Sequence, residues 1–314
     1  MRLKKFPLKI VSKLLQDPFL EQVKKRPDHL AIVTPSISFT YGDLYTRANQ
    51  LGHLLRNLGV QPNTLVAVVM EKGWEQVVGV MGILQAGGAW LPLSPDMPRD
   101  QLWRLLENAK VNLVLTQSPL AAKLEWPQST PCIPVDYYEL NEAPAIPLEQ
   151  VQKPADLAYM RYIQEPAGTF KEIMTGHQKA VSTTADISRH LGIDHRDRVF
   201  SISPFIADQW AYTIFGTLAV GGTLVMPGPD SWQVPSRWEH QLNETQATVW
   251  CSIPVALSTF VQFVQEQGRP MPGQLHSILL SEGPIPASLP EQIKSLAKDV
   301  QVITLGGNQE VSGV

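Results

Sequence analysis

The sequence predicts an α/β fold in which two layered subdomains are built on mainly parallel sheets. Short apolar runs, typical of strands buried on both faces, alternate along the chain with amphipathic segments of helical periodicity. The chain has 314 residues, which exceeds the roughly 250–300 residues at which a single hydrophobic core stops growing. We therefore expect an N-terminal extension over residues 1–17, a first subdomain over 18–153 and a second over 154–314.

The first half contains helices and strands in regular alternation. Helical periodicity predicts helices at residues 18–25, 41–58, 74–86 and 100–108. Apolar runs between turn signals predict strands at residues 65–69, 89–93 and 111–115. Gly59 follows the second helix and Gly87-Gly88 the third, as is common at helix C-termini. Residues 117–154 are rich in proline and lack a long periodic segment, so we expect a connecting region there.

The second half continues the alternation. A strand is expected around Tyr159. It is followed by a helix at 181–190, a strand at 199–202, a helix at 208–219 and a strand at 221–226. Further αβ units are expected at 238–252, 255–267, 277–280 and 289–304. The pattern contains no internal repeat of fixed period, so a layered α/β arrangement fits both halves.

Composition and charge narrow the functional classes. A hydrophobic fraction of 44% with 18% charged residues is ordinary for a globular protein. The net charge of −3, without a basic stripe, argues against a nucleic-acid partner. The basic N-terminus lacks an apolar signal region, and the apolar stretch 77–93 is interrupted short of a membrane span. Cys132 and Cys251 lack metal-like spacing. We expect a cytoplasmic protein with reduced thiols and no membrane partner.

The segment Asp156–Lys171 has the layout of a strand that leads into a phosphate-binding loop, but most of its phosphate chemistry is missing. A loop that wraps a polyphosphate needs small residues, free backbone N–H groups, hydroxyls and a cation. Gly168 and Lys171 are present, but Glu165 adds a negative charge and Pro166 removes an N–H donor. The sequence therefore predicts a chain built for nucleotide-dependent chemistry and altered at its centre.

Two segments of the first half resemble a known family. Phe39-Thr40-Tyr41-Gly42-Asp43-Leu44, with Arg47-Ala48-Asn49-Gln50-Leu51 after it, is similar to the first core motif of nonribosomal peptide synthetase adenylation domains. Residues 84–95 (LQAGGAWLPLSP) are similar to the second. From about Pro18 onward the chain is thereby identified as a member of the AMP-forming acyl, aryl and amino-acid ligase superfamily. The resemblance implies the fold of that family's large N-terminal subdomain.

The resemblance extends to the phosphate loop, where the frame is kept and most residues differ. The family's loop reads roughly YTSGSTGKPKG, whereas residues 162–172 read YIQEPAGTFKE. Only Tyr162, Gly168 and Lys171 match, and His177 falls on the family's usual histidine. The resemblance implies that Gly168 and Lys171 are remnants of a nucleotide-binding loop.

The later motifs show the same partial loss. The fifth motif, YGPTE in the family, reads GGNQE at 306–310, which implies Gly307 as a further nucleotide-binding remnant and Glu310 as a magnesium ligand. Ser281-Glu282-Gly283 replaces a GGE-like turn that sits against the nucleotide. In the family a ribose-binding aspartate, a hinge and a small C-terminal subdomain with the catalytic lysine come next. The chain stops at Val314, so we expect that subdomain to be absent.

The resemblance also implies a substrate site at the start of a helix. Residues 212–215 (YTIF) match the family's WEIF, which places Asp208 on the aspartate that binds the substrate α-amino group. Gln209 and Tyr212 would then line the side-chain pocket. No residue is assigned a catalytic role.

Each surviving residue also has a simpler interpretation. A lysine such as Lys171 is usually solvated at the surface. Asp208 near a helix N-terminus is the expected cap and dipole partner. Glu310 needs a phosphate partner to hold magnesium, and otherwise is a surface carboxylate.

Three hypotheses follow from these patterns. The favoured one is a degenerate adenylation domain that cannot activate an amino acid by itself, needs no cofactor, and acts as a structural or docking module beside synthetase domains or a carrier protein. The second is an enzyme fragment completed by another chain or domain, which would use ATP and Mg²⁺. The third is a module that binds an amino acid or carrier protein without ATP.

Overall fold

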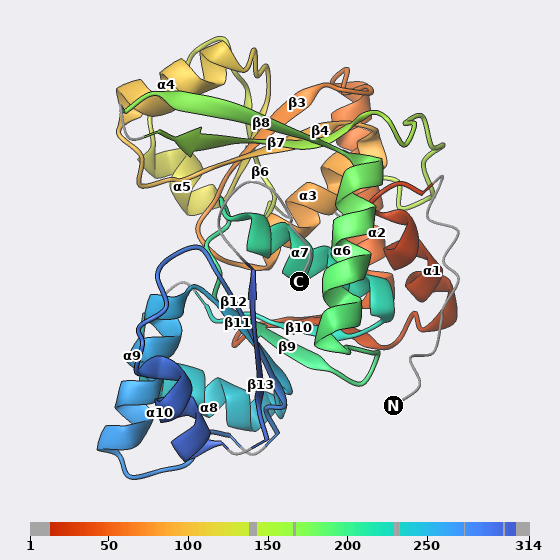
Figure 1. The fold of residues 1–314 in the computed structure, drawn as a ribbon. Coiled ribbons are helices and arrows are strands. Elements are labelled where there is room, and N and C mark those ends of the chain that lie inside the picture. Colours follow the sequence, from red (N-terminus) through yellow and green to blue (C-terminus); the bar gives the residue numbers. More distant parts are fainter. Residues whose placement is uncertain are drawn as a thin grey trace.

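The structure is a computed structural model that describes residues 13–137, 143–165, 168–228, 231, 233–272, 274–297 and 299–305, without the side chain of Asp208. Figure 1 shows two sheets, one above the other in the view, with helix α7 between them. The fold is mixed α/β with mostly parallel pairing, so the predicted fold class is confirmed.

Within the described residues the lower sheet has seven strands. In spatial order they are β13 (Gln301–Leu305), β12 (Ser277–Ser281), β11 (Val249–Ser252), β9 (Arg198–Ser201), β10 (Thr223–Val225), β1 (Leu30–Val33) and β2 (Ser38–Thr40). All neighbours pair in parallel except β1 and β2, which form an antiparallel pair at one end of the sheet.

The upper sheet has six strands in the part of the chain that the structure describes. In spatial order they are β6 (Cys132–Pro134), β5 (Val114–Thr116), β3 (Leu65–Val69), β4 (Ala89–Leu93), β7 (Leu157–Gln164) and β8 (Phe170–Gly176). Again one pair is antiparallel, the long hairpin of β7 and β8.

Helices cover both sheets. They are α1 (Asp17–Lys25), α2 (Tyr41–Asn57), α3 (Trp74–Ala86), α4 (Arg99–Asn108), α5 (Ser118–Lys123), α6 (His177–Leu191), α7 (Asp208–Val220), α8 (Pro235–Thr245), α9 (Pro254–Glu266) and α10 (Leu289–Leu296). Alternate residues of a strand point to opposite faces. Val66 and Val68 of β3 accordingly join the core of α2 and α3, whereas Ala67 and Val69 join that of α4.

One apolar core connects the two sheets. Its buried residues include Ile32 and Leu224 from the lower sheet together with Val68 and Trp90 from the upper sheet. A second core packs α8, α9 and α10 on the outer face of the lower sheet (Figure 1). The two sheets therefore share a common interior.

The expected division of the chain at residue 153 does not separate the sheets. The early strands β1 and β2 join the lower sheet, and the later strands β7 and β8 join the upper one. A parallel neighbour is reached through a crossover, so sequence order does not determine which sheet a strand enters. If each sheet is taken as one subdomain, the lower subdomain contains the early strands β1 and β2, and the upper subdomain contains the later strands β7 and β8.

Other differences concern short elements. The connecting region expected at 117–154 contains α5 and β6, and β6 pairs in parallel with β5. β1, β2 and β8 were not expected. Elements of three to seven residues carry too little periodicity to stand out, and their positions depend on partners elsewhere in the chain. The longer predicted helices and strands are present, with ends shifted by a few residues.

Helices α2 and α3 approach closely at Gly82. A Cβ atom at Gly82 would lie 2.6–2.9 Å from Cδ2, Cγ and Cβ of Leu51, which is fully buried. We expect Gly82→Ala to lower the free energy of unfolding by about 1–3 kcal/mol, because the helices must separate. The higher helix propensity of alanine, about 1 kcal/mol, offsets this only partly. Urea unfolding measures the change.

A matched control lies one turn earlier on the same helix. At Gly79 a Cβ atom would first meet the flexible end of Met70, at 3.3 Å. Gly79→Ala should therefore leave stability unchanged or raise it. Equal losses in both variants would contradict the close approach of α2 and α3.

Candidate functional site

The segment expected to wrap a phosphate forms the closed end of the β7–β8 hairpin. The strands pair as far as Gln164 opposite Phe170. The N–H of Glu165 donates to the carbonyl of Thr169 at 2.8 Å, and that of Gly168 donates to the carbonyl of Glu165 at 2.9 Å. The Thr169 hydroxyl donates to Glu165 Oε2 at 2.8 Å. These donors are thus used inside the turn, and a carboxylate lies among them.

The hairpin is also held against helix α4. The rings of Tyr162 and Phe170 meet edge to face at 6.1 Å, and both pack on the apolar core of α4. The Tyr162 hydroxyl lies 3.3 Å from the carbonyl of Leu105 and 3.3 Å from a carboxylate oxygen of Glu172. Burial, with the nearby Glu172 charge, raises the pKa of Tyr162 to about 12. Phe170, which occupies a loop position in the family pattern, here anchors a strand.

The predicted nucleotide-binding remnants have ordinary roles in this hairpin. Gly168 has a φ of +82° and open space around it, so the turn itself calls for glycine. Lys171 is exposed on β8 opposite Ile163, and its side chain forms no hydrogen bond or ion pair within the described part of the chain. Gly307 and Glu310 lie outside the described residues. The binding roles of all four stay predictions.

The predicted substrate residues lie at the start of α7, beside the end of β12. Gln209 is fully buried. Its Nε2 donates to the carbonyl of Leu279 at 2.9 Å, and its Oε1 accepts from the hydroxyl of Ser281 at 2.7 Å. Tyr212 is half-buried and has a partner. Gln209 therefore joins α7 to the lower sheet, and its predicted place in a substrate pocket, like that of Tyr212, stays a prediction. The Asp208 side chain lies outside the described atoms.

The replaced turn after β12 keeps the backbone of a glycine position. Glu282 has a φ of +57°, a conformation that costs a non-glycine residue roughly 1–2 kcal/mol. Gly283 follows with a φ of +129°. The strain at Glu282 agrees with the resemblance, in which a glycine occupies this place.

A half-buried lysine, missed by the sequence analysis, lies where the ends of the two sheets meet. Lys72 follows the carboxyl end of β3, and its Nζ donates to the carbonyl of Ser203, beyond the end of β9, at 2.9 Å. Burial lowers the pKa of Lys72 to about 7, and nearby Cys251 opposes this shift. Burial also raises the pKa of the Cys251 thiol to about 12. The sequence feature that could have identified Lys72 is its position as a lysine just after the apolar run of a buried strand.

Polar side chains near Lys72 lack partners. Ser201 and Cys251 are directly opposite in neighbouring strands. The hydroxyls of Ser201 and Ser203 are buried and have no hydrogen-bond partner among the described residues. Buried polar groups are normally paired, so such orphans indicate water or a ligand. The hydroxyls of Ser201 and Ser203 therefore remain available to a polar group.

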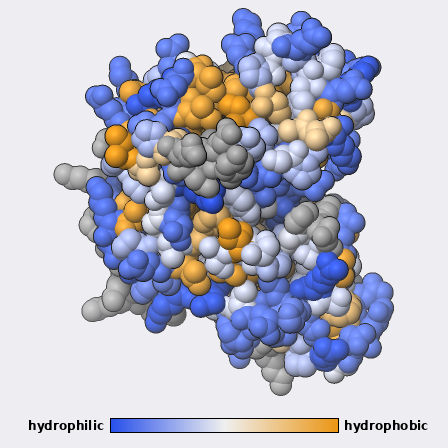
Figure 2. All heavy atoms as spheres, turned by 180° about the vertical axis from the view of Figure 1, so that it is seen from behind, coloured by the Kyte–Doolittle hydropathy of each residue, from blue (hydrophilic) through white to orange (hydrophobic). Residues whose placement is uncertain are grey.

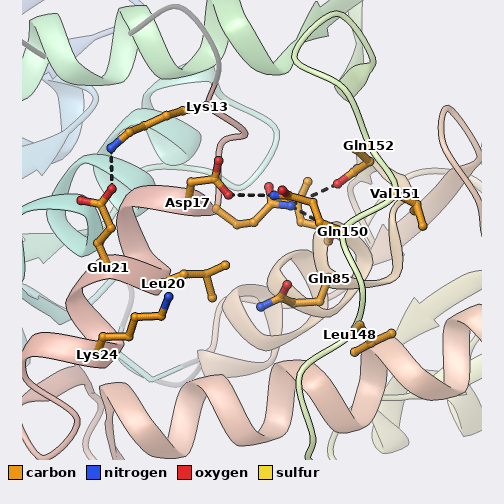
Figure 3. A pocket seen from close by; sticks show the side chains of 12 residues that line it. Lys13, Asp17, Leu20, Glu21, Lys24, Gln85, Leu148, Gln150, Val151 and Gln152 are labelled. Atoms are coloured by element: carbon orange, nitrogen blue, oxygen red, sulfur yellow. Dashed lines mark hydrogen bonds and ion pairs between the residues drawn. The ribbon is translucent and has the colours of Figure 1, made fainter. Parts of the chain in front are cut away.

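A cavity of about 400 Å³ lies elsewhere, between α1, the end of α3 and residues 148–152 (Figure 3). Asp17 accepts a hydrogen bond from Gln150, and Lys13 pairs with Glu21 across its rim. None of the predicted site residues that the structure describes lines it. This cavity is therefore separate from the predicted nucleotide and substrate site.

Two other kinds of feature are absent from the described residues. No three His, Cys, Asp or Glu side chains gather there in a way that could hold a metal ion. In the same residues no helix has the length and apolar character needed to cross a membrane. Figure 2 shows the face opposite to Figure 1, where hydrophobic residues gather mainly in the upper part among hydrophilic ones.

Comparison with protein families agrees with the motifs. The family described as AMP-binding enzyme matches residues 19–314. The anguibactin system regulator of Vibrio anguillarum is 30% identical over 310 residues, which make up 97% of this chain and 29% of that protein. Gramicidin S synthase 2 of Brevibacillus brevis is 29% identical over 307 residues, 96% of this chain and 7% of that protein. The chain thus spans less than a third of these relatives.

Solved structures give the same result. The nonribosomal peptide synthetase FmoA3 is 35% identical, with a TM-score of 0.89 over 95% of this chain and 32% of its own. An AMPPNP-bound form of FmoA3 has a TM-score of 0.90 over 96% of this chain and 32% of its own. VinN, solved with L-aspartate, is 20% identical with a TM-score of 0.81 over 95% of this chain and 77% of its own, a likeness of fold.

Proposed function

Because the chain belongs to the family of AMP-binding enzymes, we propose that it is an adenylation-type module of nonribosomal peptide synthesis that does not activate an amino acid by itself. It serves instead as a structural or docking module, with synthetase domains or a carrier protein as partners. The closed turn between β7 and β8 carries this proposal. Similarity to multidomain synthetases supports the proposed context.

The residues of the turn do not fit a triphosphate. A phosphate loop works through backbone N–H groups and hydroxyls that point at the anion. In this turn the N–H groups of Glu165 and Gly168 and the hydroxyl of Thr169 donate within the turn. The Glu165 carboxylate would repel an incoming phosphate. Each lost donor of this kind typically raises a reaction barrier by about 3–4 kcal/mol, so several losses abolish useful turnover.

The proposal is tested first by binding and activity. Isothermal titration calorimetry with ATP and magnesium should give no heat at millimolar nucleotide. Amino-acid-dependent exchange of pyrophosphate into ATP should stay at background for every proteinogenic amino acid. Clear binding of nucleotide by the unmodified chain would contradict the proposal. It would favour the alternative, an ATP- and Mg²⁺-using enzyme completed by another chain or domain.

Glu165 should be the strongest single obstacle to phosphate. Glu165→Ser removes its charge and frees the Thr169 hydroxyl. We expect measurable binding of magnesium-ATP in this variant at concentrations where the unmodified chain gives no heat. The repulsion between two unit charges about 4 Å apart amounts to ~1 kcal/mol in water and ~4 kcal/mol near a protein surface. Calorimetry on both proteins measures the difference.

A control separates this effect from a general change of charge. Glu172→Gln neutralises a carboxylate on β8, outside the turn. It should leave nucleotide binding undetectable. A similar gain in both variants would show that net charge, and not the closed turn, limits binding.

One observation favours a second candidate, binding of an amino acid without ATP. Lys72 has one hydrogen-bond acceptor, and the buried hydroxyls of Ser201 and Ser203 lack partners in the described residues. A ligand with acceptor groups would satisfy them. Thermal unfolding with each proteinogenic amino acid, without nucleotide, tests this candidate. A raised melting temperature for one amino acid supports it, and no change for any of them contradicts it.

A further inference from the structure

A small polar pocket lies far along the chain from the hairpin, between the edge strand β2 and helix α2. Its volume is about 260 Å³, and it is lined by Ser38, Phe39, Asp43, Thr46, Arg47 and Gln50. Four of these residues, Phe39, Asp43, Arg47 and Gln50, belong to the first motif that the sequence analysis singled out, and the proposed function gives them no role. The feature that distinguishes the pocket is Arg47.

Arg47 is held in place by aromatic rings. Its Cζ lies 5.5 Å from the ring centre of Phe39 and 5.5 Å from that of Trp74. These rings pack on each other with centres 5.1 Å apart, and Phe39 is buried. Cation–π contacts with these two adjacent rings orient a guanidinium without using its N–H groups. The group is therefore preorganised before any ligand arrives.

The N–H groups of Arg47 have no acceptor within the described part of the chain. No carboxylate lies within 4.0 Å of its guanidinium among those residues. The closest candidate by sequence, Asp43 one turn earlier on α2, is already engaged. One oxygen of Asp43 accepts from the backbone N–H of Thr40 at 2.9 Å and from its hydroxyl at 2.7 Å, which caps the helix. A half-buried guanidinium with five donors is left to bind an outside acceptor.

The pocket selects for a carboxylate. A guanidinium binds either a carboxylate or a phosphate through two parallel hydrogen bonds, so the choice between them depends on the pocket wall and its size. The charge of Asp43 at the pocket wall disfavours a doubly charged phosphate and tolerates a single negative charge. The volume of about 260 Å³ falls below the usual range of small-molecule sites, roughly 300–1,000 Å³, and suits one side chain.

We propose that the Arg47 pocket receives the carboxylate of an aspartate or glutamate from an acidic segment of a partner protein. An arginine and a tryptophan side by side at a surface pocket are the residue types that dominate protein–protein binding. β2 is the last strand of its sheet in the described residues, so an extended partner segment can lie along it. The inference rests on the proposed docking role, but it concerns a different surface from the β7–β8 turn.

The test uses the whole chain and a defined probe, the peptide acetyl-Glu-Glu-Glu-amide. Because Trp74 contacts Arg47, its indole N–H resonance in ¹H–¹⁵N spectra, assigned with Trp74→Phe, reports on the pocket. The peptide should shift this resonance in a saturable way at millimolar concentration. A lysine tripeptide should not. Inorganic phosphate should bind at least about tenfold more weakly than the peptide.

Variants connect the signal to Arg47. Arg47→Gln should weaken peptide binding by about tenfold or more, and Arg47→Lys should recover part of the affinity through its charge. Arg104→Gln removes the same charge from an exposed position on α4 and should change nothing. Ser38→Glu places a carboxylate on the exposed side of the pocket. It should also weaken binding, which keeps the test valid if Arg47→Gln unfolds.

Three outcomes would overturn the proposal. They are the absence of any shift with the peptide, equal binding of inorganic phosphate, and equal weakening by Arg47→Gln and Arg104→Gln. None of them depends on nucleotide binding. The carboxylate pocket and the loss of ATP binding can therefore fail separately.

Discussion

Trp90→Ala is expected to lower the free energy of unfolding by about 3–5 kcal/mol, because Trp90 connects the two sheets. It lies on β4 with 1% of its surface exposed. Its ring stacks on Tyr159 of the neighbouring strand β7 at 4.6 Å and on Phe215 of α7 at 5.6 Å. Helix α7 packs on the lower sheet, so three rings join the upper sheet to a helix of the lower one. Urea unfolding monitored by circular dichroism measures the loss.

Two comparisons sharpen this experiment. Trp90→Phe keeps an aromatic ring between Tyr159 and Phe215 and should lose clearly less stability than the alanine variant. Trp103, on the outer side of α4, is only partly buried, so Trp103→Ala should also lose less. Equal losses at Trp90 and Trp103 would contradict the connecting role. Two separate unfolding transitions in the unmodified chain would contradict the common core.

The second large effect concerns pH and His177. This residue begins α6 and is fully buried. Its Nδ1 accepts a hydrogen bond from the backbone N–H of Leu15 at 3.1 Å, so it ties the segment before α1 to the fold. Its Nε2 has no partner among the described residues. Burial lowers the pKa of His177 to about 4, against a weaker opposing effect of Asp156.

The direction of the pH effect follows from this shift. In the unfolded chain the histidine has its ordinary pKa of 6.5 and binds a proton first as the pH falls. The native state is therefore fully favoured above pH 6.5 and is progressively destabilised between pH 6.5 and about 4. The fall in pKa corresponds to about 3 kcal/mol of lost stability at the lower end.

A variant isolates the contribution of this histidine. His177→Gln keeps an acceptor for the N–H of Leu15 and cannot titrate. Urea unfolding at several pH values should show a steeper loss for the unmodified chain than for the variant below pH 6.5. Carboxylates titrate in both proteins and cancel in the difference. Parallel stability profiles would show that His177 does not remain neutral in the fold.

The closed turn is the structural basis of the proposed loss of nucleotide chemistry. From the sequence, Glu165 and Pro166 were unfavourable for phosphate because of their charge and their missing N–H. The hydrogen bonds from Thr169 and Gly168 add that the donors still present are used within the turn. Phe170 stabilises the hydrogen-bonded turn because it packs on the core of α4. Replacing Glu165 alone should recover nucleotide binding far more readily than catalytic turnover.

The candidate site could be predicted only in part. Gly168 and Lys171 could be located by motif spacing, but both lie on the β7–β8 hairpin, where the motif implied a loop. Lys72 could not, because its partner Ser203 is 131 residues away. The same limit applies to Gln209, whose amide bonds to β12. Motifs record local spacing, whereas these contacts depend on how distant strands are placed side by side.

Local sequence by itself determined the main helices, the buried strands and the family. The helix at 74–86 and its end at Gly87 follow from periodicity and a glycine with a φ of +104°. Tertiary structure decided the rest: β1 and β2 join the lower sheet, β7 and β8 the upper one, and Arg47 faces a pocket without an acceptor among the described residues. The physical reason is that helices and turns are stabilised by neighbours a few residues away. Parallel pairing and buried polar contacts join residues far apart in the chain, where no short pattern records the partner.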